Sequence, residues 1–225
     1  MARTDKRERV PMVIYPQFIS LSTKFYSPIR RDSPTDYVST IRIDILYGEE
    51  REAIGQATVY RVRMDQILND DAWSLFDIFD SHSSDLGNLY GELFDGEELN
   101  LAVADELMDY GNVVLIKSIL LLPEYRGQGL GGILALAISE QFDDRDIVAL
   151  KPWPMTADDP ENVAGAWELP RLSPAEQKTI AAKLRKSYIK AGFKPLFAGS
   201  EHLFLTNLRH PSVSQLIEKM TAEQS

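Results

Sequence analysis

The chain has 225 residues, of which 44% are hydrophobic and 26% are charged, a composition typical of a globular protein. It has no cysteine, which excludes disulfides, thiolate metal sites and cysteine nucleophiles, and its three histidines lack metal-ligand spacing, so we predict no metal site. The N-terminal stretch is charged and broken by proline, without an apolar segment long enough for a signal peptide or a membrane span, so we expect a cytoplasmic protein with no membrane partner.

The charge of the chain is strongly uneven. Its formal net charge is -10, but the segment 64–116 contains 13 acidic residues and neither Lys nor Arg, so the rest of the chain is slightly basic. A surface of one sign attracts ligands of the opposite sign, and acidic surfaces repel nucleic acid. We therefore expect no nucleic-acid partner. The segment is either a solvated acidic face or a surface that attracts a cationic ligand.

The N-terminal half is predicted to contain a hairpin followed by helices. Residues 1–34 are expected to form a partly irregular extension, 35–210 a single domain and 211–225 a C-terminal helix. Isoleucines alternate with charged residues in 39–62, which predicts an antiparallel hairpin. Apolar residues recur at a spacing of three to four in 65–93, which predicts one broken helix or two short helices.

The second half begins with an apolar run, "VVLIKSILL", which has Val, Ile and Leu on both faces. This pattern indicates a central strand that is buried on both sides. A glycine-rich turn, a mostly buried helix at 130–142 and a strand at 146–153 follow, and this order predicts a βαβ unit with one parallel strand pair. The next segment, 152–174, contains five prolines and is long for a connection, as functional loops often are.

A capping box marks the next helix. Ser173 is placed to cap the helix, a proline occupies the first helical position, and Glu176 stands three residues after the cap. The helix is expected to end at Gly192, before two short strands near 193–197 and 202–206. The predicted fold is thus a mixed α/β (α+β) arrangement, in which helices flank a mostly antiparallel central sheet with one parallel pair.

The turn "LLPEYRGQGLGG" predicts an anion site. A strand that leads through glycines into a helix presents unpaired backbone N–H groups and the positive end of the helix dipole, and Arg126 adds a fixed charge. Gly127, Gly129 and Gly132 fit the spacing of a dinucleotide turn, but the next strand ends in Lys151 and Trp153 rather than in an acidic residue. No G-K-[ST] follows, which excludes a nucleoside-triphosphate loop.

Arg126-x-x-Gly129-x-Gly131, placed after a central strand, resembles the acetyl-CoA-binding motif of the GCN5-related N-acetyltransferases. The downstream "SYIKAGFKPL", with Tyr188 four residues before Gly192, resembles a second segment of that family. The resemblance covers about 113–205 and implies acetyl-CoA as the acyl donor, bound in the gap between the two splayed parallel strands. The cofactor-binding residues that it implies are Leu120, Leu121, Leu122, Arg126, Gly127, Gln128, Gly129, Leu130, Gly131 and Gly132.

The resemblance also implies a mechanism without a nucleophilic residue. A primary amine of a cationic acceptor, small molecule or protein, attacks the thioester directly while a backbone amide of 120–122 polarises its carbonyl. Tyr188 is the expected catalytic acid for the departing thiolate, because tyrosine is protonated at neutral pH. The general base is left open among the carboxylates and a histidine, and two tryptophans are candidate walls of the acceptor pocket. These residues are Glu92, Glu98, Glu106, His202, Trp153 and Trp167.

The sequence departs from the family pattern in two places. Family members usually place two helices before the hairpin, whereas here the hairpin comes first. An asparagine that many members carry about two turns before the tyrosine is Ala181 in this chain. Two functions therefore stay open: an acetyl-CoA-dependent N-acetyltransferase, and a non-catalytic module of the same fold that binds acyl-CoA as a sensor or regulator.

Overall fold

The structure of the chain is a computed structural model. It covers most of the sequence, with gaps at the N-terminus, within the acidic segment and within the proline-rich loop. The residues that it describes are 14–29, 32–67, 69–70, 72–100, 111–158, 169–205 and 210–224.

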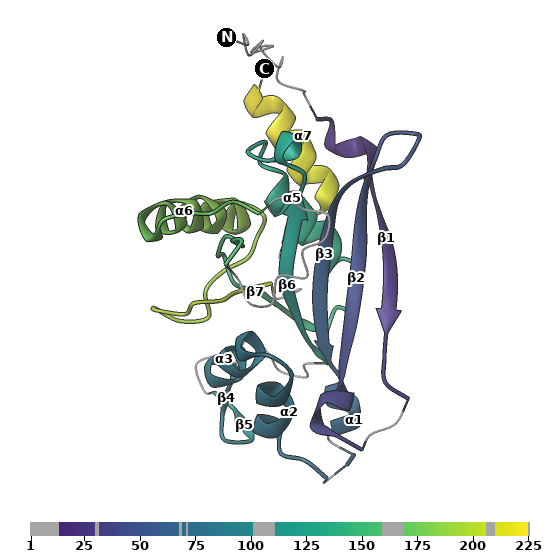
Figure 1. The fold of residues 1–225 in the computed structure, drawn as a ribbon, viewed down its shortest axis with the longest axis vertical. Helices are drawn as coiled ribbons and strands as arrows, with labels where there is room; N and C mark the ends of the chain where they lie inside the picture. The colour runs from purple at the N-terminus through teal and green to yellow at the C-terminus, as the bar shows by residue number, and fades with distance from the viewer. Residues whose placement is uncertain are drawn as a thin grey trace, which may run out of the picture.

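The described residues form one six-stranded sheet, in the order β1-β2-β3-β6-β7-β8, and a separate two-stranded ribbon, β4-β5 (Figure 1). Strands β6 and β7 are parallel, and the other neighbouring pairs are antiparallel. The prediction of a mostly antiparallel sheet with one parallel pair and flanking helices is confirmed at this level. The strands are β1 (Ile19–Tyr26), β2 (Val38–Tyr47), β3 (Glu52–Val62), β4 (Phe94–Asp95), β5 (Glu98–Leu99), β6 (Val113–Leu121), β7 (Ile147–Leu150) and β8 (Leu203–Leu205).

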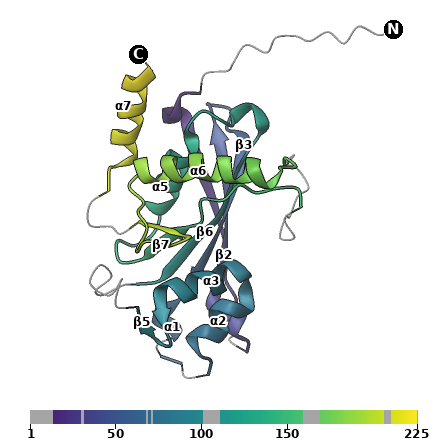
Figure 2. The same ribbon diagram turned by 90° about the vertical axis from the view of Figure 1, so that its left-hand side faces the viewer.

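Helices gather at the two ends of the sheet. Figure 1 shows α1, α2 and α3 at one end and α5 and α7 at the other, and the turned view shows α6 in front of α5 (Figure 2). No helix in the described part of the chain is both long and apolar enough to cross a membrane. The helices are η1 (Pro16–Phe18), η2 (Pro34–Tyr37), α1 (Met64–Ile67), α2 (Leu75–His82), α3 (Ser84–Leu93), η3 (Pro123–Tyr125), α5 (Leu130–Ser139), α6 (Pro174–Lys190) and α7 (Val213–Gln224).

The first half of β6, Val113–Ile116, is buried on both faces, as predicted, whereas the second half is only partly buried. Val113 and Leu115 join a cluster with the apolar side chains of α2 and α3. Val114 and Ile116 join a second cluster with those of α5. This alternation follows from the period of two along a strand, and it makes β6 the layer between two cores.

The described residues 14–29 of the predicted N-terminal extension contribute a strand to the main sheet. Of these, Ile19–Tyr26 form β1, which pairs along its whole length with β2 at the edge of the main sheet. At the other end of the chain, α7 packs Leu216 into the cluster around α5. Both β1 and α7 therefore contact the part of the chain between 35 and 210.

The helices that follow the hairpin surround a cluster of aromatic rings. Tyr90 stacks on Phe94 with 5.4 Å between ring centroids, and its ring centroid lies 5.7 Å from that of Phe79. Ser74 and Ser83 cap α2 and α3 by accepting hydrogen bonds from backbone amides in the first turn. The predicted pair of short helices is confirmed, with a single turn, α1, before it. The order of hairpin first and helices second is also confirmed.

Two predicted strands are shorter than expected. The segment 146–153 is a strand only over Ile147–Leu150, because prolines at 152 and 154 lack the N–H that a ladder needs. The segment 193–197 contributes one isolated bridge, between Lys194 and Phe204, rather than a strand. The early end of β7 leaves β6 beyond Ile116 without a paired strand on the β7 side among the described residues.

Candidate functional site

Strands β6 and β7 separate half-way along β6. Their parallel pairing covers Val113–Ile116 on β6 and Ile147–Leu150 on β7, after which β6 continues to Leu121 with only β3 beside it. The register against β3 shifts by one residue at Lys117, a β-bulge that bends β6 where the pairing with β7 stops. The β7-facing edge of β6 from Lys117 onward is therefore an open strand edge.

The direction of the backbone groups on this open edge follows from the pairing with β3. The Leu122 amide donates to the Ile54 carbonyl at 2.9 Å, so it is not available to a ligand. Residues on an antiparallel strand alternate in direction, so Leu120 also faces β3, whereas Ile119 and Leu121 face the opening. Of the predicted 120–122, only Leu121 presents its amide to the gap. Ile119 was missed, because the register of a strand cannot be read from its own sequence.

A small cavity of about 70 Å³ occupies the gap between β6 and the segment after β7. Tyr188 lies on its wall and is buried, with 8% of its surface exposed. Burial raises the pKa of Tyr188 to about 12, so this hydroxyl keeps its proton at neutral pH. It makes no hydrogen bond with any described residue. The other lining residues are Ile116, Lys117, Ser118, Ile119, Leu150, Lys151, Trp153, Pro154, Met155 and Leu184.

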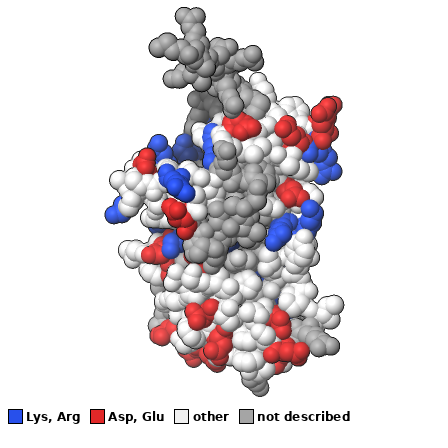
Figure 3. All heavy atoms as spheres, in the orientation of Figure 1, with Lys and Arg blue, Asp and Glu red and all other residues white. Residues whose placement is uncertain are grey.

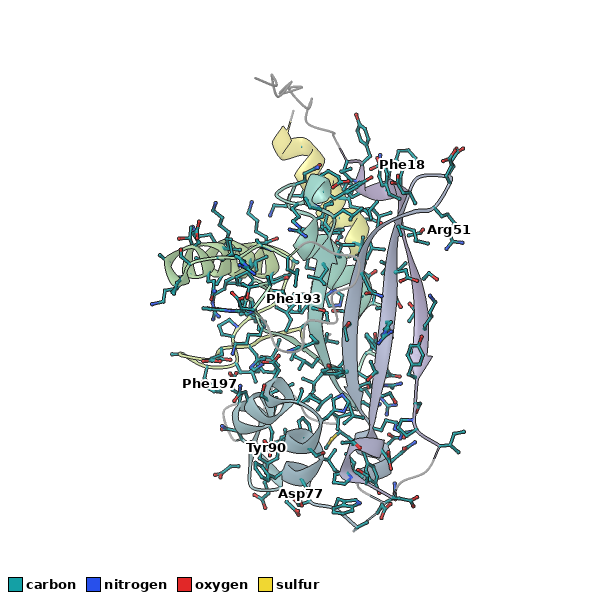
Figure 4. All side chains as sticks on the ribbon, in the orientation of Figure 1. Phe18, Arg51, Asp77, Tyr90, Phe193 and Phe197 are labelled. Carbon is teal, nitrogen blue, oxygen red and sulfur yellow. The ribbon has the colours of Figure 1, made fainter. Side chains whose placement is uncertain are left out.

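The sequence of α6 explains why Tyr188 faces the sheet. The predicted capping box is present, since Ser173 and Glu176 satisfy each other's backbone amides at the start of the helix. Leu184 and Tyr188, four residues apart, share the core-facing side. Phe193, just beyond the helix, packs its ring 6.2 Å from that of Tyr188 and lies between α6 and the sheet (Figure 4).

The glycine turn carries an uncapped helix start. Gly127 and Gly129 have φ values of 78° and 77°, which side chains disfavour. Gly129 is the N-cap of α5 and offers no side-chain hydrogen bond to the first turn. The first amides of α5 therefore have no intrahelical acceptor and lie at the positive end of its dipole.

The other predicted cofactor residues have local structural contacts. The Arg126 Nε donates to the Leu121 carbonyl at 2.7 Å, which fixes the guanidinium at the end of β6. The Gln128 side chain bridges the turn to the Ile14 amide, and Leu130 is buried in the core. Gln128 and Leu130 can therefore contribute to the binding of an anion only through their backbone amides.

Gly131 and Gly132 set how closely α5 approaches α6. A Cβ on Gly132 would lie 2.8 Å from the Ser187 carbonyl oxygen, so this glycine is required for helix packing. A Cβ on Gly131 would lie 3.9 Å from the Tyr188 hydroxyl, an ordinary contact distance. The glycine turn and the buried tyrosine are thus direct neighbours.

A basic groove of about 460 Å³ opens beside the glycine turn. Four lysines from α6 and α7 line it, and no acidic residue of the described part of the chain does. Lys183, Lys186 and Lys190 of α6 are three, four and seven residues apart in the sequence, a spacing that predicts a shared helix face. The sequence alone does not show that this face lies beside the glycine turn. The lining residues are Gln128, Gly129, Gly132, Ile133, Lys183, Lys186, Ser187, Lys190, Leu216 and Lys219.

A larger pocket of about 650 Å³ lies on the other side of α6 and carries mixed charge. Ala181, which stands where many of the acetyltransferases that the chain resembles carry asparagine, lines this pocket and not the basic groove. Trp153 also lines it, whereas Trp167 lies outside the described residues. The lining residues are Ser84, Asp85, Lys117, Lys151, Pro152, Trp153, Pro154, Met155, Thr156, Ala181, Ala182, Arg185 and Glu201.

In the described part of the acidic segment 64–116, most acidic side chains lie away from this pocket. Figure 3 shows its Asp and Glu side chains at the end of the molecule that α1, α2 and α3 form. Asp85 is the only acidic residue of the described part of the segment that lines the large pocket. The structure therefore favours the solvated acidic face over an acidic acceptor site.

The candidate bases do not reach the cavity. Glu92 lies 3.0 Å from Nδ1 of the fully buried His202 and also accepts hydrogen bonds from Ser200 and the Glu201 amide. Burial alone would raise the pKa of Glu92, but the hydrogen bonds from His202 and Ser200 lower it below its usual value, which weakens it as a base. This cluster ties α3 to the start of β8.

The remaining base candidates lie elsewhere. Glu98 is exposed in β5 and lines none of these spaces, and Glu106 lies outside the described residues. Among the described residues there is also no group of three acidic or histidine side chains that could hold a metal ion.

Comparison with known proteins found no match. No protein-family model, no curated protein and no solved structure matches the chain. Any functional assignment therefore depends on the motifs and on the geometry of the site.

Proposed function

We propose that this chain is an acetyl-CoA-dependent N-acetyltransferase of the GCN5-related type. The observation that carries the proposal is the combination of an open edge on β6, an uncapped helix start on α5 and a buried tyrosine beside both. The four-lysine groove adds support, because phosphates are bound by lysine charges together with helix-terminal amides.

In this proposal, different groups of residues bind different parts of acetyl-CoA. The amides of 129–132 and the lysines of α6 hold the pyrophosphate and nucleotide phosphate of acetyl-CoA. The pantetheine arm lies along the open edge of β6 as an added strand, where Ile119 and Leu121 supply hydrogen bonds. The Ile119 amide, beside Tyr188 on the same small cavity, is placed to polarise the thioester carbonyl.

The transfer then needs no covalent enzyme intermediate. The neutral amine attacks the acetyl carbonyl, the C–N bond forms, and the C–S bond breaks. Tyr188, with its pKa of about 12, donates a hydrogen bond to the departing sulfur and passes its proton as the charge develops. Water returns the proton to Tyr188, and the proton lost by the amine leaves to solvent.

A second candidate function is an acyl-CoA sensor or regulator without catalysis. It is favoured by one observation: no carboxylate lines the small cavity among the described residues, and Glu92 is held by His202 and Ser200. A cytoplasmic location and the absence of a nucleic-acid partner remain predictions for both candidates.

Release of free CoA separates the two candidates. The protein is incubated with acetyl-CoA and a panel of primary amines. We expect it to release CoA at least tenfold faster with one of the amines than with buffer alone, which corresponds to an activation free energy lower by about 1.4 kcal/mol or more. The release should match the acetylated amine formed, as measured by mass spectrometry. Tight binding of acetyl-CoA with no amine-dependent release would support the sensor and contradict the enzyme.

A further inference from the structure

The large pocket adjoins the open edge from the side opposite the basic groove. It shares part of its wall with the small cavity that contains Tyr188, whereas it has no lining residue in common with the basic groove. An acceptor in the large pocket would therefore meet the thioester without passing the donor's phosphates. The shared residues are Lys117, Lys151, Trp153, Pro154 and Met155.

Helix α6 divides the two spaces. Its lysines at 183, 186 and 190 face the basic groove, and Ala181, Ala182 and Arg185 face the large pocket. Arg185 lies three residues before Tyr188, about one turn away, which places their Cβ atoms roughly 5–6 Å apart. A group bound to Arg185 is thus close to the reacting centre.

The charges of the large pocket do not suit a polycation. Among the described residues, three cationic side chains and two carboxylates line it, and both of these carboxylates already form ion pairs. Lys117 pairs with Asp85, and Lys151 pairs with Glu201 at 2.6 Å. A ligand cation would have to displace a lysine from one of these carboxylates.

Arg185 is the third cation of the pocket, and neither of these two ion pairs includes it. Its Nη1 donates a long hydrogen bond of 3.5 Å to the Ser200 carbonyl, and no described carboxylate pairs with it. A partly buried guanidinium is planar and matches a carboxylate with two parallel hydrogen bonds. The rest of the wall is largely apolar, with Trp153, Met155 and prolines on the loop and Ala181 and Ala182 on α6.

We propose that the acceptor is a small primary amine that carries a carboxylate, an amino-acid-like molecule whose carboxylate binds Arg185. The amine then faces the thioester beside Tyr188, and the apolar wall holds the side chain. Ala181 supplies the room that an asparagine would fill. In the reaction the amine nitrogen forms the new C–N bond, the C–S bond breaks, and the sulfur takes a proton. This assignment depends on the proposed acetyl transfer.

Acetyl transfer to the common amino acids, each compared with its carboxamide, tests the assignment. We expect kcat/KM for at least one amino acid to exceed that for its carboxamide by about tenfold or more, the value of one charge-assisted hydrogen bond. Arg185→Ala should remove this preference by raising KM for the amino acid with little change in kcat, because the anchor acts equally before and during the reaction. Arg185→Glu should reverse the preference in favour of the carboxamide.

Lys178→Ala is the matched control, since Lys178 is an exposed cation on α6 that lines none of the three spaces. It should keep the preference, and Arg185→Ala should keep the acetyl-CoA affinity measured by calorimetry. If acetyl-CoA binds and the best acceptors are carboxamides or spermidine, the carboxylate assignment is overturned and acetyl transfer stands. If acetyl-CoA does not bind the parent protein, both are overturned.

Discussion

Tyr188→Phe is expected to slow acetyl transfer by more than tenfold while leaving stability and acetyl-CoA affinity nearly unchanged. The ring, which fills the space between α6 and the sheet, is kept, and only a hydroxyl without a hydrogen-bond partner among the described residues is removed. General acid catalysis typically contributes about 10²- to 10⁴-fold, so the loss of the donor should appear in the chemical step. The effect is measured in a single turnover, which separates transfer from product release.

Tyr125→Phe is the matched control for this substitution. Tyr125 is also buried, and burial raises the pKa of its hydroxyl, but it lines none of the three spaces at the site. Its single-turnover rate should equal that of the parent. A Tyr188→Phe rate within about threefold of the parent would mean that Tyr188 only packs the helix, and that the thiolate is protonated by another group.

Gly129→Val is expected to abolish measurable acetyl-CoA binding at concentrations that saturate the parent. A β-branched residue disfavours the φ of 77° by about 1–2 kcal/mol, and its branches project at the start of α5, where the phosphates would approach. Each lost hydrogen bond to a charged group adds roughly 1.5–3 kcal/mol, so a loss of two bonds weakens binding by at least a hundredfold. Calorimetric titration with acetyl-CoA measures the effect.

Gly48→Val is the control that separates the effect of backbone strain from the loss of contacts with acetyl-CoA. Gly48 has a φ of 73° in the turn between β2 and β3, with no atom within 4 Å of an added Cβ, and it lines none of the three spaces at the site. Both variants should therefore lose a similar amount of stability, but only Gly129→Val should lose the ligand. Equal acetyl-CoA affinity in the two variants would show that the glycine turn has a purely structural role.

Several features of the fold could be predicted because they depend on local signals. The alternating isoleucines of β2, the apolar run of β6 and the capping box at Ser173 each determine their structure within a few residues. The turn at 127–132 could also be predicted from its glycines, and two of them do adopt positive φ values. The edge strand β1 was missed because its serines and its Lys24 weaken the apolar pattern, and its pairing with β2 is a long-range choice.

The finer geometry of the site depends on register and on distant helices, which sequence patterns do not specify. Which amide of β6 faces the gap depends on the pairing of Leu122 with Ile54 on β3. The basic groove forms because α7 brings Lys219 to the lysines of α6, and the large pocket forms because α3 brings Asp85 to Lys117. The sequence also gives no sign that burial raises the pKa of Tyr188 above that of an exposed tyrosine.

The central claim is that the open edge of β6, the glycine turn and the lysine groove together bind acetyl-CoA. Thermal unfolding of the parent protein, measured with acetyl-CoA and in parallel with NADH, tests it most directly. At about 100 times its dissociation constant, a ligand adds roughly 2.7 kcal/mol to stability, so acetyl-CoA should raise the melting temperature by several degrees while NADH leaves it unchanged. No shift with saturating acetyl-CoA, together with a shift from NADH, would contradict the claim.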